Sequence, residues 1–116
     1  MSRELLDTLR WQFDLTWRLA QHYLPELTDD ACLWAPAPDA WTVRKDSEGR
    51  WRADWAAAEP DPAPPTTIGW LTWHVIWWWS GAAAALVGNA PPARDDAPWP
   101  GDAASAVARI GVLAEG

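Results

Sequence analysis

The fold of this chain is decided by residues 66–80, which read Thr66-Thr67-Ile68-Gly69-Trp70-Leu71-Thr72-Trp73-His74-Val75-Ile76-Trp77-Trp78-Trp79-Ser80. Five of the twelve tryptophans and one of the two histidines lie in this stretch, and no charged residue interrupts the chain from Ile68 to Val87. The run predicts a helix, because a threonine hydroxyl can accept from the free amides of the first turn. Gly88-Asn89, followed by Pro91-Pro92, is expected to end it.

His74 is the residue of this helix with the richest chemistry. At about 100° per residue it shares one sector with Trp70, Trp77, Trp78, Gly81 and Ala85. The opposite strip is the least hydrophobic part of the helix, so we expect it to meet water. It consists of Thr72, Ile76, Ser80 and Ala83. This orientation places the imidazole on the buried side, where its two nitrogens require hydrogen bonds or a metal ion. The residues alone do not favour hydrogen bonding over metal ligation for His74.

Composition bounds the class of protein. A chain of 116 residues is expected to form one domain, spanning residues 1–116. A net charge of −7, a single lysine and dispersed arginines disfavour a nucleic-acid partner, which requires a basic stripe. Cys32 stands alone, which excludes an internal disulfide, and Met1-Ser2-Arg3-Glu4 shows no signal-peptide pattern. We therefore expect a cytoplasmic protein. Ile68 to Val87 is long enough to cross a bilayer, but its central indoles and missing basic flank disfavour a membrane location.

The residues before the central helix predict a second helix and a long loop. From about Ser2 to Leu24 an apolar stripe follows helical spacing, formed by Leu6, Leu9, Phe13, Trp17, Ala20 and Leu24. Trp11 and Leu15 lie on its outer face, which suggests a covering loop or a partner subunit. The Trp/Pro-rich segment from Trp34 to Pro65 is expected to pack over the helices, because disordered linkers are poor in aromatic residues.

Three shorter elements are expected around these helices. Thr28 can cap a single helical turn, and the turn formers at 46–49 can join residues 41–44 and 50–52 in a hairpin. Asp102 can cap a last helix with a weak apolar stripe, made of Ala103, Ala106, Val107, Ile110 and Leu113.

Several short segments of this sequence resemble the DinB superfamily, in particular its tryptophan-rich actinobacterial-type members. They are the central run 66–75, the first-helix word 9–15, Cys32-Leu33-Trp34-Ala35-Pro36 and Trp41-Thr42-Val43-Arg44. The resemblance covers roughly Leu5 to Gly101 and implies an all-α, up-down-down-up four-helix bundle that is often dimeric. It also implies a divalent metal, Zn or Ni, held by three histidines, of which His74 matches the first. Related members are thiol-dependent S-transferases that use a low-molecular-weight thiol.

The sequence departs from the family pattern after His74. The other two ligands normally lie four residues apart on a fourth helix, and no histidine follows His74 here. We therefore expect a bundle truncated to about three helices, with the long Trp/Pro-rich loop between the first and second. One histidine cannot close a catalytic metal site, and a missing helix leaves the core stripe uncovered. Such a bundle is expected to recruit a second copy, to swap elements between copies, or to be only marginally stable.

Two functional hypotheses follow. The first is a DinB-like metalloprotein, in full-length form a thiol-dependent S-transferase or metal-dependent hydrolase, whose isolated chain is inactive. In it His74 binds the metal, and a pocket for a small apolar substrate is lined by Trp70, Trp77 and Trp78. The alternative is a non-catalytic small-molecule-binding or dimerisation module. In that case His74 is a buried hydrogen-bonding group, and the tryptophans form a pocket or the seam of a homodimer.

Overall fold

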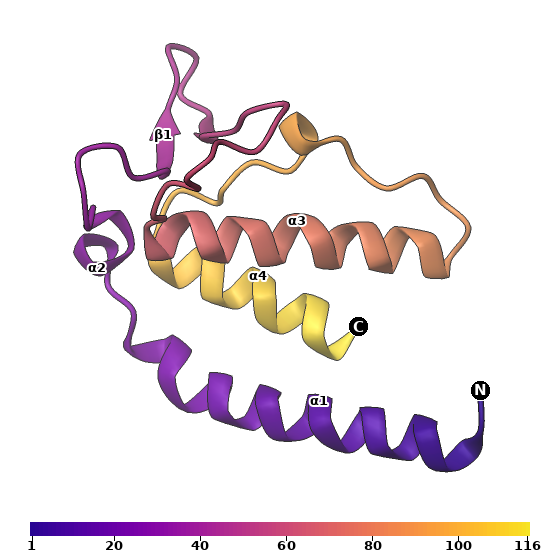
Figure 1. Ribbon diagram of the computed structural model, residues 1–116. Coiled ribbons are helices and arrows are strands. Elements are labelled where there is room, and N and C mark those ends of the chain that lie inside the picture. The colour runs from indigo at the N-terminus through magenta and orange to yellow at the C-terminus, as the bar shows by residue number, and fades with distance from the viewer.

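Helix α3, Ile68–Leu86, is the centre of the computed structural model (Figure 1). Thr67 caps it, and its Oγ1 accepts a hydrogen bond from the amide of Trp70 at 3.2 Å. Gly88 follows the helix with a φ of 77°, a left-handed conformation that favours glycine and turns the chain out of the helix. The predicted start and stop of this helix are confirmed. None of the helices combines the length and hydropathy that crossing a bilayer requires.

Helix α4, Ala103–Glu115, lies along α3 and closes one side of the core (Figure 1). Asp102 caps it by accepting from the amide of Ser105 at 2.7 Å, as predicted. Three residues of its predicted stripe are buried in the same cluster as the core of α3: Ala103, Ala106 and Ile110. The two alanine side chains are small, so they allow the two helix backbones to approach closely.

The buried face of α3 differs from the one predicted. Thr72 and Ile76 were expected to meet water, and this expectation is wrong, because both are almost completely buried. Trp99, in the loop before α4, donates from its Nε1 to the Thr72 hydroxyl at 3.0 Å. Ile76 packs in the core cluster together with Trp99 and Ile110. A helix that is apolar all round does not reveal which of its faces the neighbouring segments cover.

The segment between α1 and α3 contains a short helix and a hairpin. Helix α2, Asp29–Leu33, is capped by Thr28, and strands β1, Val43–Lys45, and β2, Trp51–Ala53, pair antiparallel. The amide of Trp41 donates to the Pro65 carbonyl, and the amide of Thr67 donates to the Trp41 carbonyl, both at 2.9 Å. These bonds attach the segment to the first turn of α3.

Gly69 allows α2 and β1 to approach α3 closely. A Cβ at this position would lie 3.0 Å from the Cys32 carbonyl oxygen and 3.1 Å from Cγ2 of Val43. Any side chain would therefore separate these elements, which explains a glycine in the first turn of a helix that glycine otherwise weakens.

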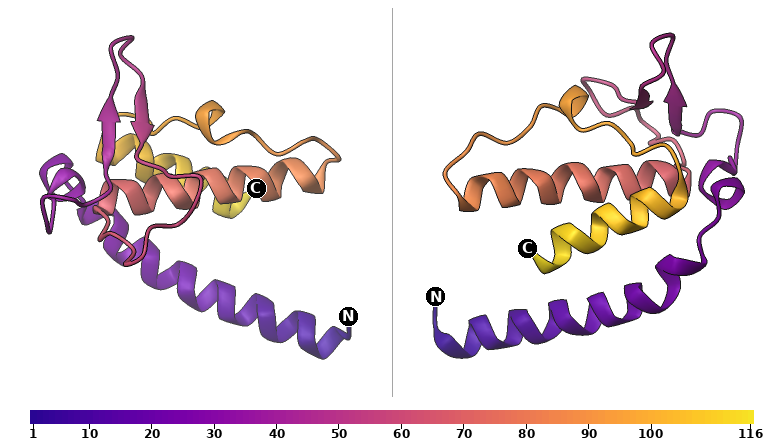
Figure 2. Two further views of the ribbon diagram at one scale, coloured as in Figure 1. Left: turned by 45° about the horizontal axis from the view of Figure 1, so that its top comes forward. Right: turned by 180° about the vertical axis from the view of Figure 1, so that it is seen from behind.

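Helix α1, Arg3–Tyr23, stands apart from this core (Figure 2). Ser2 caps it, and the 3-10 turn η1, Leu24–Glu26, links it to the rest of the chain. Its bounds agree with the prediction, but it contains no buried residue. No hydrogen bond or salt bridge joins α1 to α3 or α4. The structure is therefore mostly helical, with three long helices of which only two are tightly packed.

Candidate functional site

The structure brings His74 together with the three tryptophans predicted to surround it. The imidazole stacks on Trp70 with ring centroids 5.0 Å apart and an interplanar angle of 14°. Trp78 lies at 5.0 Å and Trp77 at 6.5 Å, both at steeper angles. The predicted sector of α3 is therefore real. This sector of α3 is only partly enclosed, because His74 is half-buried and Trp78 is 63% exposed.

The indoles of α3 are held in place by loop carbonyls. Trp70 donates from Nε1 to the Asp54 carbonyl at 2.9 Å, and Trp73 donates to the Ala97 carbonyl at 2.7 Å. Trp77 donates to the Pro92 carbonyl at 3.2 Å. Each bond ties α3 to a loop that precedes or follows it, and a buried indole N–H needs such a partner. These three tryptophans therefore orient the loops around α3.

His74 has none of the partners that a metal site requires. Its ring nitrogens make no hydrogen bond, and no fully buried side-chain nitrogen or oxygen in the chain lacks one, so the imidazole is open to solvent. Burial by the indoles lowers the pKa of His74 and favours the neutral ring. The chain contains no group of three His, Cys, Asp or Glu side chains that could hold a metal ion. A catalytic zinc site takes three protein ligands, so the residues present do not fit the metal that the resemblance implies.

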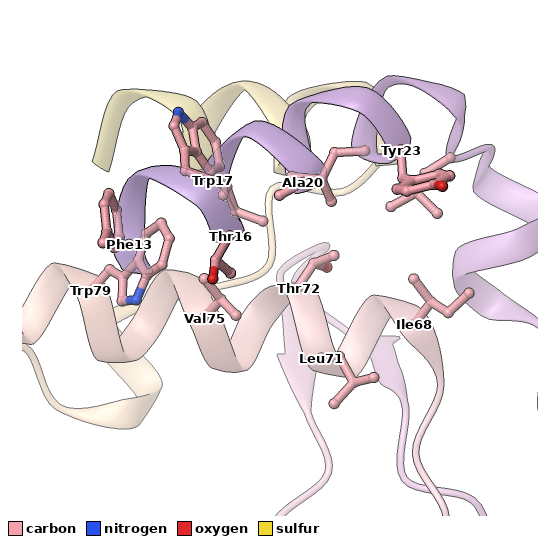
Figure 3. Close-up of a pocket in the computed structure, with 13 residues that line it drawn as sticks. Phe13, Thr16, Trp17, Ala20, Tyr23, Ile68, Leu71, Thr72, Val75 and Trp79 are labelled. Atoms are coloured by element: carbon pink, nitrogen blue, oxygen red, sulfur yellow. The ribbon is translucent and has the colours of Figure 1, made fainter. Parts of the chain in front are cut away.

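An apolar cavity lies on a different face of α3. It has a volume of about 430 Å³ and separates α1 from α3, with η1, Leu27 and Ile110 at its edges. Figure 3 shows side chains of α1 and α3 pointing into the space between the two helices. We call this cavity the α1–α3 groove. It is lined by Phe13, Thr16, Trp17, Ala20, Tyr23, Leu24, Leu27, Ile68, Leu71, Thr72, Val75, Trp79 and Ile110.

The groove contains no charged side chain and three hydroxyl groups, those of Thr16, Tyr23 and Thr72. The Thr72 hydroxyl is already engaged, because it donates to the Gly69 carbonyl at 2.7 Å and accepts from Trp99. No general base or activated nucleophile is therefore present among its walls. The arrangement suits the binding of an uncharged, apolar surface.

None of the sequence-predicted site residues lines this groove. His74, Trp70, Trp77 and Trp78 all lie outside its walls, so the groove is a feature that sequence reasoning missed. A signal for it existed on α3, where Leu71, Val75 and Trp79 recur at intervals of four residues. Reading that stripe against the inner stripe of α1 would have identified two facing apolar walls.

Cys32 has the environment of a structural residue. It is fully buried, and burial, with a smaller effect of the Asp29 carboxylate, raises the pKa of its thiol. Asp29 accepts from the amide of Ala103 at 2.7 Å and so links α2 to the start of α4. A buried thiol with a raised pKa stays protonated and is a poor nucleophile.

Comparison with protein families identifies the superfamily of this chain. Residues 12–115 match the DinB superfamily, which is most of the chain. The chain belongs to the DinB superfamily. No curated protein and no solved structure matches it.

In this DinB chain, His74 occupies the second turn of α3, the place that the resemblance assigns to the first metal ligand of the family. The only other histidine is His22, in the last turn of α1, where its ring packs edge-on against Tyr23 at 4.8 Å. No group of three potential metal ligands includes His74 in this DinB-superfamily chain.

Proposed function

We propose that this DinB-superfamily chain acts as a binding module whose α1–α3 groove accepts one uncharged, apolar occupant. The observation that carries the proposal is a groove of about 430 Å³ with no charged wall. Pockets that bind small molecules have volumes of roughly 300–1,000 Å³ and are lined mainly by apolar and aromatic side chains.

The driving force is the burial of apolar surface that the chain leaves exposed. Phe13 is 43% exposed on the α1 wall, and Leu71 is similarly exposed on the α3 wall. Removing such surface from water gains about 25 cal/mol per Å². Because neither wall carries a charge, an ionised ligand would lose its hydration without gaining a partner. The groove therefore selects against charged occupants.

The test uses Nile red, an uncharged apolar dye whose fluorescence rises in apolar surroundings. It is titrated against the protein at the lowest protein concentration that the fluorescence permits. The variant Ala20→Trp fills the groove from the α1 wall, and we expect it to weaken dye binding at least about tenfold. The control is Ala108→Trp, the same change at an exposed alanine of α4 outside the groove. Equal dye binding by both variants would contradict the proposal.

A second proposal is metal-dependent thiol transfer or hydrolysis at His74, with Zn or Ni and a low-molecular-weight thiol. It is supported by the DinB match and by the position of His74 in the second turn of α3. Because no group of three potential ligands includes His74, further ligands would have to be supplied to it, for example by a second copy of the chain.

Metal analysis of the purified protein tests this second proposal. About one tightly bound divalent ion per metal site, lost in the variant His74→Ala, would support it. A metal content that is negligible, or that His74→Ala leaves unchanged, would contradict it and would leave the binding proposal unaffected.

A further inference from the structure

We infer that the α1–α3 groove takes one unbranched alkyl chain of about 12 to 14 carbons, such as that of a fatty alcohol. The uncharged polar end of the ligand lies at Tyr23 and its tail points towards Trp79. This inference rests on the proposed binding function of the groove and names the class of ligand for that site. It is drawn from the length, the volume, the lining and the two ends of the groove.

The groove is long because its walls follow two helices. The lining residues of α3 extend from Ile68 to Trp79, and those of α1 from Phe13 to Tyr23. Figure 3 shows Phe13 near Trp79 at one end and Tyr23 across from Ile68 at the other. At about 1.5 Å per residue, the two walls are about 16 Å and about 15 Å long. An extended alkyl chain advances about 1.3 Å per carbon, so about 12 carbons reach from end to end.

The volume of the groove indicates a chain of nearly the same size. It is about 430 Å³. A methylene group is similar in size to a water molecule, whose share of liquid volume is about 30 Å³, so the groove holds about 14 such groups. Because length and volume agree, the groove is about one chain wide. A compact or branched molecule with as many carbons would not reach both ends.

The middle of the groove is lined by aliphatic side chains. They are Ala20, Leu24, Leu71, Val75 and Ile110. Such side chains attract apolar groups without a preferred direction, which suits a flexible chain. The aromatic rings at the Trp79 end do not form a slot for a flat molecule, because Phe13 and Trp17 meet Trp79 at interplanar angles of 50° and 64°.

The two ends of the groove differ in polarity. At one end the ring centroid of Trp79 lies 6.0 Å from that of Phe13 and 6.2 Å from that of Trp17, so apolar rings limit the groove. At the other end Tyr23 is 62% exposed, and its hydroxyl makes no hydrogen bond. A phenolic hydroxyl can donate to or accept from a neutral polar group. The polar end of the ligand therefore belongs at Tyr23, beside water.

The charges around the Tyr23 end favour an uncharged ligand over an anionic one. The chain has no lysine or arginine from Leu19 to Val43, whereas Glu26, Asp29 and Asp30 follow Tyr23 closely. Helix α3 has no charged residue, and Arg109 of α4 does not line the groove. The net charge of −7 repels anions as well. A carboxylate at this end would therefore meet like charges and no cation.

The first test measures how 1-hexanol, 1-octanol, 1-decanol and 1-dodecanol displace Nile red, each below its solubility limit. With the wild type we expect the affinity to rise through 1-dodecanol, by up to about fourfold for each added carbon. Thr16→Phe obstructs the groove seven residues from Tyr23. That leaves about 10 Å, or about 8 carbons, so the affinity of this variant should stop rising after 1-octanol.

Two further variants control this test. Val75→Phe obstructs the groove from α3 at the same depth, seven residues from Ile68, and should show the same limit. Thr8→Phe makes the change of Thr16→Phe at a position of α1 outside the groove and should keep the wild-type series. Circular dichroism verifies that all three variants retain the helices. A wild-type affinity that does not rise with chain length overturns the inference. So does a series that continues to rise to 1-dodecanol in both obstructed variants.

The second test concerns the polar end of the ligand. Tyr23→Phe removes one hydroxyl, and we expect it to weaken 1-dodecanol binding about two- to tenfold. Dodecanoate has the same chain with a charged end, and at about pH 8 it should bind the wild type at least about tenfold more weakly than 1-dodecanol. Unchanged binding in Tyr23→Phe, or equal affinity for the alcohol and the carboxylate, overturns the placement of an uncharged end at Tyr23.

Nile red itself separates failure of this inference from failure of the binding function. If the wild type binds the dye and Ala20→Trp weakens that binding, but the alkanols show no dependence on chain length, the binding function stands and the alkyl chain is the wrong ligand. If the wild type does not bind the dye, the binding function is wrong and the inference falls with it.

Discussion

Helices α3 and α1 are similar in length and in capping and opposite in burial. They have 19 and 21 residues, each is capped by a hydroxyl side chain, and each carries tryptophans on an apolar stripe. Five residues of α3 are buried, including Trp73 at 1% exposed, whereas no residue of α1 is. The tightly packed part of this protein is therefore the pair α3 and α4, together with the loops that cover them.

The difference shows what directs burial in this chain. Hydrophobic attraction has no preferred direction, and both helices offer apolar surface. Three indoles of α3 donate to carbonyls in the loops on either side, whereas the indole N–H groups of Trp11 and Trp17 in α1 make no hydrogen bond. The loops are thus attached to α3 by directional bonds, and α1 lacks any comparable attachment.

The largest expected effect comes from truncating the centre of the α3 core. Trp73→Ala removes a side chain that stacks on Trp77 at 5.3 Å and bonds Ala97, so we expect a loss of about 3–5 kcal/mol of unfolding free energy. Trp17→Ala in α1 is the matched change, and its effect in dilute protein should be clearly smaller. Urea denaturation followed by circular dichroism measures both. Equal losses would mean that α1 is packed as firmly as α3.

The next effect concerns a threonine on each side of the groove. Thr72→Val keeps the shape of the side chain but leaves the buried Nε1 of Trp99 without its acceptor, which should cost about 1–3 kcal/mol. Thr16→Val makes the same change on the α1 wall, where the hydroxyl makes no hydrogen bond, and should cost nearly nothing. Thermal unfolding of the two variants tests the contrast. A cost for Thr16→Val similar to that for Thr72→Val would contradict it.

A smaller effect separates the two helix caps. Thr67→Ala removes the cap of α3 and a hydrogen bond to the Thr42 hydroxyl at 3.0 Å, so we expect a loss of about 1–2 kcal/mol. Ser2→Ala removes the equivalent cap of α1, whose hydroxyl accepts from the amide of Leu5. Because α1 stands outside the core, its uncapping should fray the helix end and leave the global unfolding midpoint unchanged. A fall in that midpoint as large as that of Thr67→Ala would show that α1 unfolds with the core.

The smallest effect is a dependence of stability on pH through His74. Its pKa in the folded chain is lowered from the ordinary value of 6.5 because the indoles desolvate the imidazolium. The unfolded chain therefore takes up the proton first, so this contribution to stability is complete above about pH 6.5 and is lost as the pH falls below it. Comparing denaturation midpoints at about pH 8 and about pH 5 should show a smaller acid loss for His74→Gln than for the wild type. An identical loss in both proteins would contradict the assignment to His74.

The sequence alone determined the helix boundaries, because they are set by local chemistry. The caps Ser2, Thr28, Thr67 and Asp102 each satisfy an amide within three residues, and Gly88 ends α3 with a conformation that other residues avoid. The sequence of the central helix also resembles the DinB superfamily, and the match over residues 12–115 confirms that membership. The cytoplasmic location, the metal and the thiol stay predictions, since they depend on partners and surroundings outside the chain.

Only the tertiary structure decided which faces these helices cover. An all-apolar α3 has no preferred inner side in its sequence, so the choice is made by Trp99, which bonds Thr72 across 27 residues, and by α4. That choice leaves His74 half-buried among indoles and opens the groove on the side of Leu71, Val75 and Trp79. Local periodicity fixes where a helix runs and which residues share a face. Which face is covered depends on contacts between distant segments, and these form only when the whole chain packs.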